Sequence, residues 1–162
     1  VVVFLTAFYL IRGMLQSRAA ERNADWLAQI KKDDHKHALP LRLQAYERLT
    51  LFLERISPGP LVLRVHKSNM TSQMLHSELL ATVREELEHN VTQQIYVSDR
   101  AWSQVKMAKE ETLRIVNIAF EQTGPNASGT LSQRVFKTAS RLSHLPTQEA
   151  ILTLKEEVRR LF

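Results

Sequence analysis

The residues that break helices are few in this chain, and most of them lie in two short clusters. Only four of the 162 residues are glycine and five are proline, and the clusters are Pro58–Pro60 and Gly124–Gly129. The long stretches between them are rich in Leu, Glu, Arg, Gln and Ala, which favour helix. The sequence therefore predicts an all-α protein in which short loops join antiparallel helices into a bundle.

The composition sets limits on the fold and on the classes of site. A chain of 162 residues with 44% hydrophobic content can form one ordinary domain with a packed core. The chain has no cysteine, so disulfides and thiolate metal sites are excluded, and a reducing compartment suits it. The net charge of +5 is modest and fits weak attraction to an anionic membrane surface better than binding to nucleic acid.

The chain opens with an uncharged run, Val1–Ile11, and its first residue is not methionine. A membrane-spanning helix needs about 20 apolar residues. We therefore interpret the run as the end of a truncated transmembrane helix whose earlier residues precede Val1. An ordinary buried helix is the alternative. The residues predicted to form the membrane anchor are Val1, Val2, Val3, Phe4, Leu5, Phe8, Tyr9, Leu10 and Ile11.

Three arginines follow the apolar run, at Arg12, Arg18 and Arg22. Basic residues beside a span favour the cytoplasmic side and attract anionic lipid headgroups. A secretory signal peptide would instead carry its basic residues before the apolar core. We expect residues 1–32 to be an anchor with a juxtamembrane helix, and residues 33–162 to be a cytoplasmic helical domain at a bacterial inner membrane.

Apolar residues recur at steps of three and four along most of the remaining chain, which predicts amphipathic helices. The clearest covers about Pro40 to Ile56. Either Asn69 or Thr71 is expected to cap the next helix, Ser98 the one after it, and Thr147 the last. We expect the end of that last helix, at Phe162, to be docked against the bundle.

Two short runs have the composition of strands, Leu61–Val65 and Val91–Val97. A lone strand is not stable, so a short helical turn or an extended linker is favoured for the first. The second is interpreted as a helix continuation or a tight connector. The alternative that both are strands stays open at this point.

The strongest chemical signal is the Glu86-x-x-His89 pair, which places two potential metal ligands on one helix face. Di-iron helical bundles use two such pairs and two further glutamates, whereas this chain has one pair. A metal-dependent helical-bundle enzyme that uses Glu86 and His89 is therefore an alternative, and helix capping by His89 is the simpler interpretation. With no nucleophile motif and no glycine-rich phosphate loop, we expect neither catalysis nor a cofactor.

A group of polar and aromatic residues stands between two strongly apolar helices. Such a group either fixes helix geometry through buried hydrogen bonds or forms a partner-binding patch. We also expect Glu47 and Glu54 to pair with nearby arginines, Arg64 among them. The residues of the group are Asn90, Gln93, Gln94, Tyr96 and Trp102.

Three segments, Leu39–Pro58, Glu85–Ser98 and Leu154–Phe162, together with Trp102, resemble a family of small, uncharacterised bacterial membrane-anchored proteins. The resemblance covers nearly the whole chain. It implies one N-terminal spanning helix and a cytoplasmic helical region. It carries no known activity and so assigns no catalytic residue.

These features together predict a binding role. We expect a membrane-anchored interaction protein, scaffold or accessory subunit of a membrane complex, without catalytic activity. Its expected partners are proteins, including a second copy of the chain, and membrane lipids. No nucleic acid is expected, because acids dilute the basic residues along every helix. A soluble nucleic-acid-binding helical module remains a second alternative.

Overall fold

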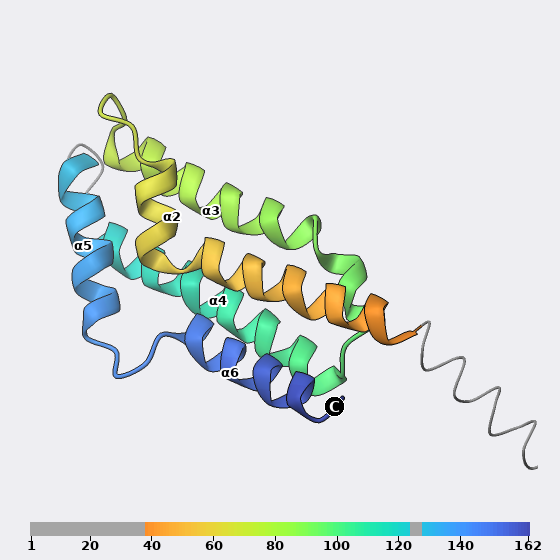
Figure 1. Cartoon of the computed structure of the whole chain (residues 1–162). Helices are drawn as coiled ribbons and strands as arrows, with labels where there is room; N and C mark the ends of the chain where they lie inside the picture. Colours follow the sequence, from red (N-terminus) through yellow and green to blue (C-terminus); the bar gives the residue numbers. More distant parts are fainter. Residues whose placement is uncertain (1–37, 124–127) are drawn as a thin grey trace, which may run out of the picture. The chain divides into compact units, whose positions relative to one another are not determined.

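The computed structural model describes residues 38–123 and 128–162 (Figure 1). Every regular element in these two ranges is helical, so the all-α prediction is confirmed there. Residues Leu41–Phe162 belong to one compact unit. The predicted truncated transmembrane helix and the flank of Arg12, Arg18 and Arg22 lie outside the described residues. Among those described, no helix combines the length and the apolar character that a membrane span requires.

Six α-helices and one short 3₁₀ helix make up the described part of the chain. The first α-helix covers residues 38–56. The others are α2 (Pro58–Val65), α3 (Ser72–Glu88), the 3₁₀ helix η1 (Val91–Ile95), α4 (Asp99–Glu121), α5 (Ser128–Ser140) and α6 (Pro146–Arg159).

The four long helices, residues 38–56, α3, α4 and α6, run side by side with alternating directions, and α2 and α5 pack across one end (Figure 1). Helix α4 packs against α3, α5 and α6. The apolar stripe predicted for the first helix is buried, because each turn brings one or two large side chains to the same face. Fully buried core residues include Leu49, Phe52, Leu53, Ile56, Leu61, Leu75, Leu79, Val105 and Leu154.

The Leu61–Val65 run forms the last five residues of helix α2 and not a strand. Pro58 stands in the first turn of α2, where its fixed φ fits a helix and its missing N–H is not needed. Leu61, Val62 and Val65 are buried whereas Leu63 is 76% exposed, which is helical spacing. The Pro58–Pro60 cluster therefore starts one helix as well as ending another.

The second β-like run is a tight connector. Residues Val91–Ile95 form one short 3₁₀ helix, and Tyr96 follows as its C-cap. Its backbone turns the chain from the end of α3 to the start of α4, which is the common use of 3₁₀ geometry. No strand pairs with it in the described ranges.

Two of the predicted N-caps are confirmed and one is wrong. The Thr71 hydroxyl accepts the N–H of Met74 at 3.2 Å, and the Ser98 hydroxyl accepts the N–H of Ala101 at 3.0 Å. Thr147 does not cap α6. Pro146 occupies the first turn and moves the cap back to Leu145, so Thr147 lies inside the helix, with a buried hydroxyl that has no partner.

The C-terminal end is docked less than expected. Leu161 packs against the core, but Phe162 is 84% exposed. The expectation that Phe162 is docked is therefore wrong. Helix α6 has already ended at Arg159, so the apolar stripe of the helix does not extend to the last residue.

Candidate functional site

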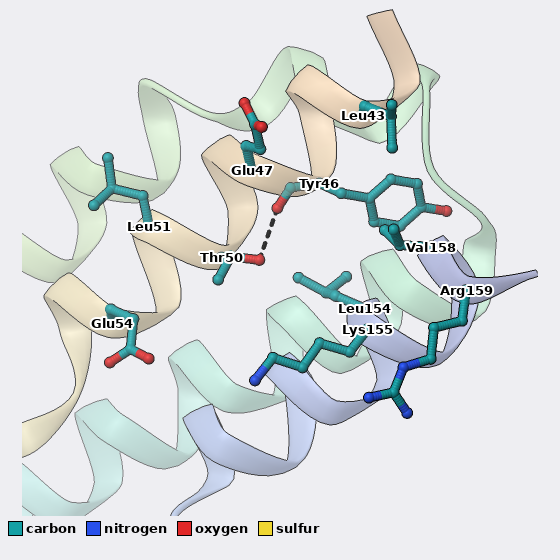
Figure 2. Close-up of a pocket in the computed structure, with 10 residues that line it drawn as sticks. All are labelled: Leu43, Tyr46, Glu47, Thr50, Leu51, Glu54, Leu154, Lys155, Val158 and Arg159. Carbon is teal, nitrogen blue, oxygen red and sulfur yellow. Dashed lines mark hydrogen bonds between the residues drawn. The ribbon is translucent and has the colours of Figure 1, made fainter. Parts of the chain in front are cut away.

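An apolar groove runs between the first helix, residues 38–56, and helix α6 (Figure 2). Its volume is about 720 Å³, which is in the range of ligand-binding clefts. The two walls are far apart in sequence, since the first helix begins at residue 38 and α6 ends at Arg159, but they are neighbours in the fold. The lining residues are Leu43, Tyr46, Glu47, Thr50, Leu51, Glu54, Leu154, Lys155, Val158 and Arg159.

The floor of the groove is formed by side chains that the two helices direct toward each other. Tyr46 and Leu154 are buried, and Leu43 and Val158 are half-buried. The Thr50 hydroxyl donates to the carbonyl of Tyr46 at 2.8 Å, so it is satisfied within its own helix (Figure 2). The floor therefore offers a mainly apolar surface without an unsatisfied hydroxyl at Thr50.

Leu51 extends this apolar surface onto the outer side of the first helix. It is 60% exposed, although its neighbours Phe52 and Leu53 are buried in the core. A single exposed leucine needs no explanation in a soluble protein. Here it borders an open apolar groove, and that combination is typical of a binding surface.

Charged residues of opposite sign stand on the two banks of the groove. Glu47 and Glu54 lie on the first helix, and Lys155 and Arg159 lie on α6 (Figure 2). All four side chains are exposed. Within the ranges that the structure describes, none of the four forms an ion pair. The groove thus has an acidic bank and a basic bank, both available to a partner.

A polar junction fixes the spacing of the banks at one end. The Tyr46 hydroxyl donates to Oε2 of Glu157 at 2.9 Å, and the Ser98 hydroxyl donates to Oε1 of the same carboxylate at 2.6 Å. Burial raises the pKa of Tyr46, and the hydrogen bond to Glu157 and its negative charge raise it further, whereas Arg42 opposes the shift. One carboxylate therefore joins the first helix, α4 and α6.

The expected pairing of Glu47 and Glu54 with nearby arginines is wrong. Arg64 pairs with Glu86, and Arg42 and Arg48 donate to the carbonyls of Tyr96 and His89, respectively. Arg55 Nε and Arg64 Nη1 each donate to Oε1 of Glu86 at 2.8 Å. The Glu86 side chain is 14% exposed. Burial opposes its ionisation, but the hydrogen bonds and charges of the two arginines outweigh that effect and lower its pKa.

This pairing also gives the two candidate metal ligands structural roles. The Glu86 carboxylate already holds two guanidinium groups, so a metal ion would have to displace them. His89 is the C-cap of α3, and its carbonyl accepts Arg48 Nη2 at 3.4 Å. In residues 38–123 and 128–162, no group of three His, Asp or Glu side chains is placed to hold a metal ion.

The predicted polar cluster is divided by the fold. Asn90 is buried and donates to the carbonyl of Glu86 at 2.7 Å, and Gln93 is buried in η1. Gln94 is exposed, and the partly exposed Tyr96 accepts Arg42 Nε at its carbonyl, 3.3 Å away. Trp102 is half-buried against the core. Asn90 and Gln93 have the burial expected of a structural role, and a partner role for Gln94 and Tyr96 stays a prediction.

The family of unknown function DUF7935 matches residues 1–161. The chain belongs to this family. No curated protein and no solved structure matches it significantly. Membership confirms the resemblance to an uncharacterised family, and it covers both the groove residues and the N-terminal run. It assigns no activity and does not test the membrane anchor.

Proposed function

We propose that this DUF7935 protein is a membrane-attached interaction module that binds a protein partner through the groove between residues 38–56 and α6. One observation carries the proposal. An open apolar groove is lined by four exposed charges that have no ion-pair partner among the described residues. The separation of these charges by sign across the apolar floor gives the groove a pattern that a partner can match.

The shape of the groove favours a helix as the bound element. Two long helices form the walls, and helices of a partner can pack along them with their apolar residues over the floor. Amphipathic helices commonly bind in such grooves through apolar anchors spaced three or four residues apart. The apolar floor would hold those anchors, and the two charged banks would select the flanking residues.

Membrane attachment is the second part of the proposal. It is supported by the uncharged run Val1–Ile11 and by the arginines Arg12, Arg18 and Arg22 that follow it. A soluble domain held at the bilayer would present its groove to membrane complexes at a raised local concentration. The role would be that of a scaffold or accessory subunit with a cytoplasmic domain.

Native purification in mild detergent tests the binding role. The wild type is expected to retain a stoichiometric protein partner, which includes a second copy of the chain. Leu51→Asp should lose that partner, because it places a charge beside the apolar floor. Leu63→Asp is the matched control, since Leu63 is 76% exposed on α2. A wild type that is monomeric and without any partner would refute the binding role.

Membrane extraction tests the attachment. Isolated membranes are washed with high salt and then with alkaline carbonate. We expect the chain to stay in the pellet after both washes, because an apolar segment inserted in the bilayer is not held there by electrostatic contacts. Release by salt alone would show that only electrostatic contact held the chain there, and it would refute the anchor.

A further inference from the structure

We propose that the occupant of the groove is the groove of a second copy, so that two chains form a symmetric antiparallel four-helix arrangement. This inference rests on the proposed binding role and names its partner. It follows from the signs of the charges on the two banks: Glu47 and Glu54 on one side of the apolar floor, Lys155 and Arg159 on the other.

A two-fold axis parallel to the groove exchanges the two banks. In a second copy related by that axis, the acidic bank lies over the basic bank of the first copy, and its basic bank lies over the acidic bank of the first copy. Both sets of contacts are then attractive, as an isologous interface requires. A two-fold axis across the groove would instead place acid over acid and base over base, which is unfavourable.

The register of the two helices supports the first arrangement. The hydrogen bond from Tyr46 to Glu157 places these residues at the same level of two antiparallel helices. At about 1.5 Å rise per residue, Glu47 lies within one helical turn of both Lys155 and Arg159 along the groove. Rotation about the groove axis preserves these levels. Glu47 of one copy would therefore meet the basic bank of the other, whereas Glu54, about 9 Å beyond Lys155 at the same rise per residue, would add only a longer-range attraction.

Helix directions agree with the same axis. The first helix and α6 are antiparallel within one copy (Figure 1). Because the rotation keeps each direction along the groove, the first helix of one copy would lie beside an antiparallel α6 of the other. All four neighbouring pairs would be antiparallel, which is the arrangement of an ordinary four-helix bundle. The leucines and valine of the floor would supply its centre.

Charge reversal with mixing tests this directly on the full-length chain in detergent. Glu47→Lys with Glu54→Lys makes both banks basic, and Lys155→Glu with Arg159→Glu makes both acidic. All four positions are exposed, so the variants should fold, which circular dichroism can check. Light scattering should give a dimeric protein mass for the wild type, a monomeric mass for each double variant alone, and a dimeric mass for an equimolar mixture of the two.

Several results would overturn the inference, and they can be told apart. Dimers that persist in either double variant alone would show that the groove charges do not govern association. A mixture that stays monomeric would refute the bank-to-bank pairing. If the wild type instead carries a different protein that both double variants lose, and the mixture does not associate, the binding role survives and the second copy is refuted. A monomeric wild type without a partner would refute both.

Discussion

Two acidic sites of this bundle differ in whether the rest of the fold pairs with them. Glu86 sits between Arg55 and Arg64, is largely shielded from water and has a lowered pKa. Glu47 and Glu54 stand exposed on the bank of an apolar groove, and neither has an ion-pair partner among the described residues. The ion pairs of Glu86 join three helices, so we assign Glu86 a structural role. Glu47 and Glu54 join no helices in this way and border the apolar groove, which is why we assign them to binding.

The largest loss of stability is expected from a substitution of Glu86, which pairs with two arginines. Glu86→Gln keeps the shape of the side chain but leaves Arg55 and Arg64 close together without a counter-charge. Since both arginines are partly exposed, we expect a loss of about 1.5 kcal/mol in the free energy of unfolding. Urea denaturation followed by circular dichroism measures it. An unchanged free energy of unfolding would mean that Glu86 contributes no more to stability than the groove charges do. It would contradict the distinction between the two acidic sites.

The next effect is expected at the polar junction that closes one end of the groove. Tyr46→Phe removes one hydrogen bond to Glu157 and leaves Ser98 as its partner. We expect a loss of about 1 kcal/mol in the free energy of unfolding, from the same denaturation experiment. Ser98→Ala, which also removes an N-cap, should cost at least as much. Full stability of both variants would show that Glu157 does not join the three helices.

The pH dependence of stability offers a smaller test of Glu86. Its folded pKa lies below the ordinary value of 4.5, so the folded state binds fewer protons than the unfolded state in this window. The ion pair therefore contributes fully above about pH 4.5, and the contribution is lost as pH falls through the folded pKa. The stability difference between wild type and Glu86→Gln should shrink on acidification. A difference that is constant down to pH 3 would contradict the pairing.

The smallest effect on stability is expected in the groove itself. Glu47→Gln or Lys155→Gln should change the free energy of unfolding by less than about 0.5 kcal/mol, because neither charge has an ion-pair partner among the residues that the structure describes. The same substitutions should weaken association measurably. A loss of stability as large as that of Glu86→Gln would show that the groove charges serve the fold, and it would remove the reason for calling the groove a binding site.

The sequence predicted the elements that depend on local chemistry. Periodicity located the first helix to within two residues of its start, and the hydroxyls of Thr71 and Ser98 marked two helix starts because N-capping is a local hydrogen bond. Leu61–Val65 was ambiguous because its β-branched residues favour strands, and the N-terminal proline of α2 together with burial against the core decided for helix.

The groove could not be predicted from the sequence. Its two walls are more than 90 residues apart along the chain, and its width is set by how α6 packs on α4 and by the junction at Glu157. The partners of Glu86 were missed for a similar reason. Local spacing suggests pairs within one helix, whereas Arg55 and Arg64 reach Glu86 from two other helices.

Photo-crosslinking in living cells tests the groove most directly. A photoreactive amino acid is placed at Leu51 beside the groove or, as a control, at Leu63 on α2, which is more exposed than Leu51. We predict a crosslinked product at position 51, of twice the mass of the chain if the partner is a second copy, and no discrete product at position 63. Absence of a product at position 51, or equal products at both positions, would contradict the groove as the binding site.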